Sequence, residues 1–198
     1  MKTLLLAFIL PFAIALPALA ALKPGASAPA FSARVSVAGK ESIFSLAEAL
    51  QRGPVVVYFY PSAYTSGCNL EAHAFATEMD AFSAAGIAVI GISHDSIVRL
   101  NDFSADPKYC AGKFPVASDP DGAIARSFGL AVTEAKPGAT DTRGQPIDHA
   151  FTERTTFVIA PSGKIAAVIS SANDHVAPSD HAAKSLVEAQ KLTKGKVR

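Results

Sequence analysis

Runs of apolar residues alternate with helical patterns along this chain. The strongest run, Val-Val-Val-Tyr-Phe-Tyr at residues 55–60, combines β-branched and aromatic side chains and predicts a buried strand. Apolar side chains then recur at helical spacing over residues 65–85, and Gly86 follows as a helix stop. A second buried run at 87–93 precedes another helical segment at 96–105. This order of strand, helix, strand and helix is typical of an α/β protein.

The rest of the chain adds shorter elements to this pattern. It predicts a helix at 45–51, with Ser45 as its N-cap and Glu48 in a capping box. A strand at 114–117 and a helix at 122–128 follow. The last elements are a hairpin with strands at 155–160 and 164–170 and a closing helix at 179–192 with Ser179 as its N-cap. We therefore expect a central mixed sheet with helices on both faces, with parallel strands early and an antiparallel hairpin late. Segment 131–150 is rich in Gly, Pro, Asp and Thr, and we expect an exposed insertion there.

The first twenty residues have the pattern of a bacterial export signal. A basic start at Met1-Lys2 precedes an apolar stretch at 3–16, and Pro17-Ala18-Leu19-Ala20 offers small residues for cleavage. We expect a signal peptide at 1–20, a single domain at 21–198, and a periplasmic or secreted protein. A retained membrane anchor is the alternative, although the apolar run is short for a span and contains proline.

Charge and cysteine count exclude some classes of function. The 18 Lys and Arg against 17 Asp and Glu give a formal net charge of +1, and removal of Lys2 with the signal would leave 17 of each. A nearly neutral chain gives no reason to expect a nucleic acid or an anionic surface as partner. Two cysteines are too few for a disulfide framework, but an oxidising compartment would allow them to be paired at rest.

Cys68 is the leading candidate for chemistry. It falls in the first turn of the helix predicted at 65–85, just after Pro61 ends the strand. Unpaired backbone N–H groups and the positive end of the helix dipole favour a thiolate there. The small neighbours Thr65, Ser66 and Gly67 suit an accessible turn. The alternative is a buried structural cysteine.

Three polar residues are candidates to assist this thiol. Thr65, three positions earlier, can reach the sulfur or an oxygen bound beside it, and this role is compatible with its alternative role as the helix N-cap. Glu71 would repel a thiolate as a direct neighbour, so it makes more sense as the anchor of an arginine that points at the sulfur; the alternative is a solvated carboxylate. Arg154 enters a strand of β-forming residues and either faces solvent or points into a site at the sheet edge.

The ordered set of motifs resembles the peroxiredoxin family. The pattern P-x-x-x-T-x-x-C at Pro61, Thr65 and Cys68 is similar to the active-site signature of that family, and Arg154 with the hairpin after it looks like its arginine strand. Further matches are Pro24-Gly25-x-x-Ala28-Pro29-x-Phe31-Ser32, Gly91-Ile92-Ser93-x-Asp95, Phe114-Pro115-x-x-Ser118-Asp119 and Phe128-Gly129. Together they cover almost the whole expected mature chain, and they most resemble the bacterioferritin-comigratory, or Q, type.

The resemblance implies a thioredoxin-like fold with an N-terminal extension. It implies a thioredoxin-dependent type of enzyme that reduces hydrogen peroxide and organic hydroperoxides with a thioredoxin-like or other thiol reductant. No metal or organic cofactor, nucleic acid or stable membrane association is expected, and the protein would be a monomer or dimer. Carried onto this sequence, Cys68 is the peroxidatic thiol, Thr65 and Arg154 orient the peroxide and stabilise its leaving oxygen, Pro61 shields the thiolate, and Glu71 holds the arginine.

One departure concerns the second, resolving cysteine. Many members of this type carry it five residues after the first, where this chain has His73. Other members carry it in the region of Cys110, so the resemblance implies a Cys68–Cys110 disulfide that forms after local unfolding. Its loop of about 43 residues would contribute roughly 4 kcal/mol by chain entropy. The alternatives are an inert Cys110 with an external resolving thiol, or a disulfide between subunits.

Two other functions remain open at this point. A thiol–disulfide oxidoreductase on a related fold is one, although the chain lacks the C-x-x-C pair that such enzymes use. The other is a non-catalytic exported scaffold in which a permanent Cys68–Cys110 bridge is structural.

Overall fold

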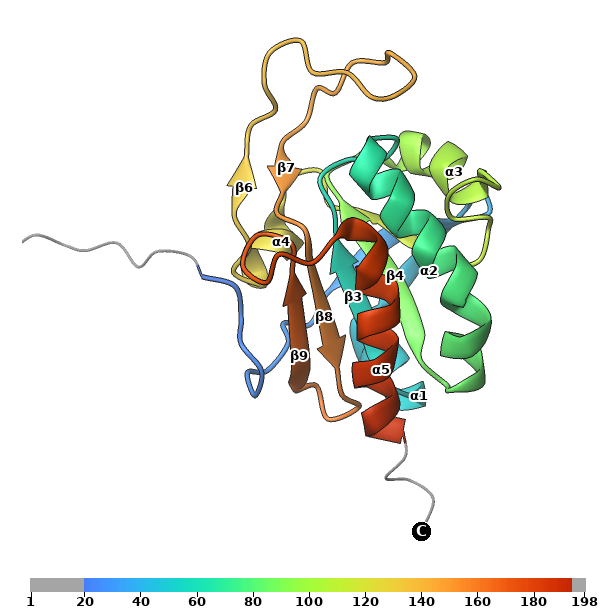
Figure 1. The fold of residues 1–198 in the computed structure, drawn as a ribbon, viewed down its shortest axis with the longest axis vertical. Helices are drawn as coiled ribbons and strands as arrows, with labels where there is room; N and C mark the ends of the chain where they lie inside the picture. The colour runs from blue at the N-terminus through green and yellow to red at the C-terminus, as the bar shows by residue number, and fades with distance from the viewer. Residues whose placement is uncertain (1–19, 194–198) are drawn as a thin grey trace, which may run out of the picture.

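The structure is a computed structural model that describes residues 20–193 (Figure 1). Residues 1–19 of the expected signal peptide therefore lie outside the described residues. Between residues 20 and 193, no helix is long and apolar enough to cross a membrane.

A seven-stranded sheet runs through the centre of the molecule in the order β2-β1-β5-β4-β3-β8-β9, where β1 is Ser32–Val37 and β2 is Lys40–Ser45. In its middle, β3 (Val55–Phe59) is parallel to β4 (Ala88–Ser93), and β4 is parallel to β5 (Val116–Ser118). On its other side, β3 pairs antiparallel with β8 (Thr155–Ile159), which forms a hairpin with β9 (Ile165–Ser170). The predicted mixed sheet, with parallel strands first and an antiparallel hairpin last, is confirmed.

Helices cover both faces of this sheet, which is why its central strand β3 is apolar throughout. One face carries α2 (Ser66–Ala84), α3 (Ile97–Ala105) and α5 (His181–Thr193), and the other carries α1 (Leu46–Arg52) and α4 (Ala123–Ser127). Alternate residues of β3 serve the two cores, because Val56 and Tyr58 pack beneath α2 whereas Val57 and Phe59 pack on the opposite side. Figure 1 shows α2 and α5 side by side on the near face.

Several elements differ from the sequence prediction. Strands β1 (Ser32–Val37) and β2 (Lys40–Ser45) form a hairpin that the prediction missed, and β6 (Val132–Thr133) pairs with β7 (Phe151–Thr152) in a small second sheet. The predicted cap Ser179 is wrong, because a 3-10 helix at Pro178–Asp180 precedes α5 and Ala177 is its N-cap.

The connection between β6 and β7, residues 134–150, is here called the β6–β7 loop. Most of this loop is exposed, as the sequence predicted, while Asp141 and Ile147 are buried. Figure 1 shows the loop at the same end of the molecule as the first turn of α2. The loop is therefore placed to contact the segment that carries Cys68.

Candidate active site

Cys68 is the third residue of α2 and lies beside the end of β3. Pro61 follows the last β3 residues, and Thr65 occupies the N-cap position with an extended backbone. Cys68 thus lies in the first helical turn, as the sequence predicted, but only 1% of the residue is exposed. Ser66 in this turn is exposed, but the expected access to the thiol is absent, since the sulfur belongs to the core formed by α2, α3 and α5.

The structure brings Arg154 and Glu71 together with this sulfur. Arg154 lies between β7 and β8, and its Nη2 donates to the Cys68 Sγ at 3.2 Å. Its Nη1 forms an ion pair with Oε2 of Glu71, whose side chain is fully buried. Of the two alternatives for Arg154, the structure has the one in which the guanidinium points into the site. Glu71 holds the guanidinium in this position, so it is not the solvated carboxylate of the alternative interpretation.

Gly67 gives the guanidinium room to approach. A Cβ atom added at this position would lie 3.2 Å from Nη2 of Arg154, which is tighter than an ordinary van der Waals contact. The sequence suggested that small residues beside the cysteine provide access to solvent. In the structure, the space above Gly67 is filled by the arginine.

Thr65 and Pro61 form the other side of the site. Thr65 is the N-cap residue of α2, as the sequence allowed, but its hydroxyl donates to the Ser62 carbonyl oxygen at 2.9 Å and makes no capping hydrogen bond with the helix. Thr65 acts to lower the pKa of the Cys68 thiol, although the hydrogen bond to Ser62 uses the one hydrogen of its hydroxyl. Pro61 is half-buried at the end of β3, next to this turn.

Burial and charge act against each other on the Cys68 thiol. Burial is the largest influence and raises its pKa; the Glu71 carboxylate acts in the same direction, while Arg154, Thr65 and the Ser62 backbone lower it. The balance lies above the ordinary value, which differs from the expectation that the helix N-terminus would favour a thiolate. The ionisation of Cys68 therefore depends on how far the ion pair with Glu71 neutralises the positive charge of Arg154.

The turn before Cys68 is held by the β6–β7 loop. Tyr64 has a positive φ of 64°, an uncommon conformation for a residue with a side chain. Its carbonyl oxygen accepts hydrogen bonds from the backbone N–H and the hydroxyl of Thr142, at 3.0 and 2.7 Å. The Arg143 guanidinium lies 3.2 Å from the centre of the Tyr64 ring, a cation–π contact. These contacts stabilise the strained turn from a distant part of the sequence.

Asp95, which follows β4, also stabilises this turn. Its carboxylate accepts from the Ala63 backbone N–H at 2.7 Å, from the Ser62 hydroxyl at 3.1 Å and from the Ser93 hydroxyl at 2.7 Å. His149 of the β6–β7 loop lies 2.9 Å away through Nε2, and Arg99 lies at the same distance through Nε. Asp95 belongs to the motif Gly91-Ile92-Ser93-x-Asp95, but its spacing alone indicates no role for it.

Ser62, His149 and Asp95 do not form a hydrolase triad. Ser62 and Asp95 both approach the same ring nitrogen, Nε2, whereas Nδ1 lies 2.8 Å from the Ala150 carbonyl oxygen. A relay needs the serine and the carboxylate on opposite nitrogens. The network is therefore structural.

Cys110 lies in the turn after α3 and is fully buried, in the same core as Cys68. Both cysteines are free thiols in the structure, so the pairing at rest that the sequence allowed is not present. Burial raises the pKa of Cys110 well above the usual range. His73, at the position of the missing resolving cysteine, lies 3.1 Å from the Lys108 carbonyl oxygen through Nδ1, so α2 contacts the Cys110 turn directly.

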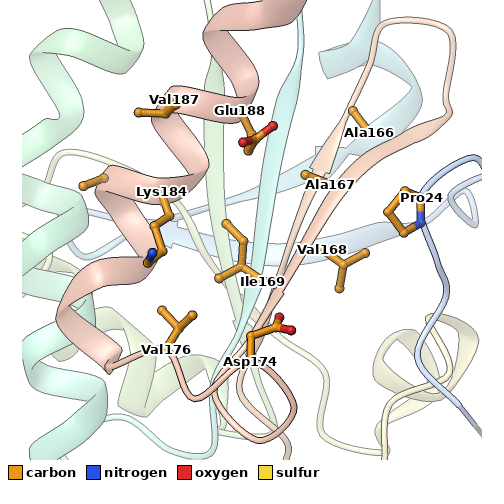
Figure 2. Close-up of a pocket in the computed structure, with 11 residues that line it drawn as sticks. Pro24, Ala166, Ala167, Val168, Ile169, Asp174, Val176, Lys184, Val187 and Glu188 are labelled. Carbon is orange, nitrogen blue, oxygen red and sulfur yellow. The ribbon is translucent and has the colours of Figure 1, made fainter.

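A separate groove of about 610 Å³ lies between β9 and α5, away from Cys68. Figure 2 shows its mostly apolar lining, with Asp174, Lys184 and Glu188 at its edges. Over residues 20–193, no group of three or more His, Cys, Asp or Glu side chains is arranged to hold a metal ion.

Comparison with known proteins places this site in a family. The model of the AhpC/TSA family matches residues 24–168. A protein of Mycobacterium tuberculosis named as a peroxiredoxin is 35% identical over 144 residues, which cover 73% of this chain and 82% of the relative. Peroxiredoxin Bcp of Xanthomonas campestris is 32% identical over 111 residues, or 56% of this chain and 62% of that protein.

A solved structure agrees with these sequence matches. The bacterioferritin comigratory protein of Xanthomonas campestris superposes with a TM-score of 0.62 at 26% identity, covering 81% of this chain and 91% of that one. The thioredoxin-like fold expected from the motifs is thereby confirmed. The chain belongs to the AhpC/TSA family of peroxiredoxins, enzymes that act on hydroperoxides, and its relatives include proteins of the bacterioferritin-comigratory or Q type.

Proposed function

We propose that this chain is an exported thiol peroxidase that reduces hydrogen peroxide and organic hydroperoxides through the thiolate of Cys68. The observation that carries the proposal is the 3.2 Å contact between the Arg154 guanidinium and the Cys68 sulfur, with Glu71 holding that guanidinium in place. Export rests on the pattern of residues 1–20 alone.

The chemistry begins with attack of the thiolate on one peroxide oxygen. A sulfur–oxygen bond forms as the oxygen–oxygen bond breaks, so the sulfur becomes a sulfenic acid and the other oxygen leaves as hydroxide or alkoxide and takes up a proton. Negative charge moves from the sulfur to the leaving oxygen during this step. Arg154 lies beside the sulfur, and donors aimed at developing charge stabilise a transition state more than the ground state.

The second step in this proposal is resolution by Cys110. Its thiolate attacks the Cys68 sulfenic sulfur, a disulfide forms, and the oxygen leaves as water. Both cysteines are buried, so the first turn of α2 and the turn that carries Cys110 must open locally before they can meet. Opening would also expose the Cys110 thiol to water and remove the burial that raises its pKa. A thioredoxin-like or other thiol then returns two electrons.

Mass spectrometry after one equivalent of hydrogen peroxide tests both steps. We expect a Cys68–Cys110 disulfide in the wild type, a trapped sulfenic acid in Cys110→Ser, and no oxidation in Cys68→Ser. Absence of oxidation at residue 68 would contradict the peroxidase. A sulfenic acid that persists in the wild type, or a disulfide between two chains, would contradict only the role of Cys110. Insulin reduction by the protein would instead indicate a thiol–disulfide oxidoreductase.

A further inference from the structure

His181, the first residue of α5, is a buried histidine in contact with the active-site carboxylate. Its side chain is fully buried, and its Nδ1 lies 3.5 Å from Oε1 of Glu71. Glu71 binds Arg154 through the other oxygen, Oε2, and Arg154 reaches the Cys68 sulfur. One continuous line of contacts therefore connects His181 to the reactive thiol.

Hydrogen bonds fix which ring nitrogen of His181 carries a proton. The Ser171 hydroxyl lies 2.8 Å from the Val176 carbonyl oxygen, which can only accept, so its single hydrogen points there. The Ser171 oxygen lies 3.0 Å from Nε2 of His181 and is left to accept, so Nε2 is the N–H of the ring. A neutral His181 therefore turns its bare Nδ1 toward Glu71.

In that arrangement the lone pair of His181 Nδ1 faces the carboxylate oxygen Oε1 of Glu71, which is unfavourable unless a proton lies between the two atoms. Oε1 of Glu71 is buried and has no hydrogen-bond partner within residues 20–193. The Thr156 hydroxyl lies 2.8 Å from Nδ1 and can donate to it or accept from it, so it suits either protonation state. An unpartnered buried carboxylate oxygen is costly, and one proton shared with Nδ1 removes that cost.

We propose that His181 is a positioning residue that shares one proton with Glu71 and thereby leaves the positive charge of Arg154 to the Cys68 thiolate. The proposal rests on the peroxidase function proposed above and concerns the control of the same site. Without this proton, Glu71 is fully negative, binds Arg154 as an anion and repels a negative sulfur. With it, Cys68 is the only full negative charge within residues 20–193 that faces the guanidinium.

The direction of both titrations agrees with one shared proton. Burial raises the pKa of Glu71 to about 8 despite the opposing effect of Arg154, and burial lowers the pKa of His181 to about 4, with Arg154 acting in the same direction. At neutral pH these values leave one proton on the pair. The other groups that act on the pair and its neighbours are Cys68, Tyr58, Asp174, Asp180 and Lys184.

The variant His181→Asn tests the proposal, because an asparagine amide can donate to Glu71 but cannot bind an additional proton. Its control is His175→Asn, six residues earlier, where the side chain is exposed and the positive φ of 54° suits asparagine. The readout is the rate constant for Cys68 oxidation by hydrogen peroxide from pH 5 to 10, together with the thiolate absorbance, in a Cys110→Ser background.

We expect His181→Asn to move the midpoint of the pH profile upward by about one unit, so that the rate below the midpoint falls roughly tenfold while the rates converge at high pH. His175→Asn should keep the wild-type profile. A purely structural role would lower the rate equally at every pH and leave the midpoint unchanged, and that result would overturn the proposal. Failure of the wild type to react would instead contradict the proposed function.

A measurement on the wild-type protein keeps the proposal testable if His181→Asn does not fold. The carboxyl carbon of Glu71 and the Nδ1 nitrogen of His181 should titrate together in NMR spectra, with a common midpoint near the raised pKa of about 8 for Glu71. If neither resonance moves between pH 6 and 10, no proton is shared and the inference fails.

Discussion

The contact between His149 and Asp95 predicts that the β6–β7 loop loosens as pH rises. Nδ1 of His149 lies 2.8 Å from the Ala150 carbonyl oxygen, and Nε2 lies 2.9 Å from the Asp95 carboxylate. Both partners accept hydrogen bonds, so both ring nitrogens carry hydrogen and His149 is an imidazolium in the closed loop. Burial acts to lower the pKa of His149, but the hydrogen bond and charge of Asp95 raise it above the ordinary 6.5.

The sign of the effect follows from that raised pKa. The contribution of His149 to stability is present in full below pH 6.5 and is lost as pH rises through its folded pKa. Asp95 behaves in the opposite way. Burial acts to raise its pKa, but its hydrogen bonds, that from His149 above all, lower the pKa below the ordinary value. The contribution of Asp95 to stability is therefore lost only as pH falls through that lowered pKa. The loop is therefore held best in mildly acidic solution.

The magnitude follows from one charge-assisted hydrogen bond. Such bonds contribute roughly 1.5–3 kcal/mol, and we take the lower end because the His149 side chain keeps 13% exposure and solvent screens the charge. A loss of about 1.5 kcal/mol increases the open population of the loop roughly tenfold.

Hydrogen exchange measured by mass spectrometry on residues 134–150 at pH 6 and pH 9 checks this value. After correction for the intrinsic exchange rate, we expect the opening equilibrium to rise about tenfold at pH 9. His149→Gln, which does not titrate, should show no such change. Equal opening at both pH values in the wild type, or the same pH dependence in His149→Gln, would refute the reasoning.

Three further predictions follow from single contacts. Gly67→Ala should slow oxidation of Cys68 by hydrogen peroxide several-fold, because the added Cβ would lie 3.2 Å from Arg154. The control Ser66→Ala, at an exposed residue, should not change the rate. Equal stopped-flow rates for both variants would argue against the close approach of Arg154 to Gly67. Phe82→Ala should lower the free energy of unfolding in urea by about 3–5 kcal/mol, because the ring is fully buried in the core under α2, and a loss below 1 kcal/mol would be inconsistent with that packing. Asp141→Ala should increase proteolytic cleavage in the β6–β7 loop, because its buried carboxylate binds two arginines, and an unchanged cleavage rate would rule out this bracing role.

The sequence predicted the sheet well where its strands are buried on both faces. The all-apolar run of β3 and the helical spacing of α2 leave few alternatives, so these elements were found almost to the residue. The β1–β2 hairpin was missed because β2 is mostly exposed and its residues show no clear alternation. Edge strands carry a weaker signal than central strands for this reason.

The candidate site was harder to predict because its residues come from distant segments. Spacing placed Cys68 and Thr65 in one turn, but it did not decide whether Arg154, 86 residues away, faces solvent or the sulfur. His181 and His149 have no local motif around them, and only the tertiary structure brings them to Glu71 and Asp95. Gly67 is the local signal that could have indicated the arginine, because its missing side chain makes room for the guanidinium.

The most direct test of the site is the rate at which Cys68 reacts with hydrogen peroxide when the guanidinium is removed. Arg154→Met keeps the length of the side chain but not its charge, and Arg52→Met at the exposed end of α1 is the matched control. We predict that stopped-flow kinetics will show a fall of about hundredfold or more for Arg154→Met and no change for Arg52→Met. Equal rates for Arg154→Met and the wild type would contradict the role of Arg154 beside the sulfur.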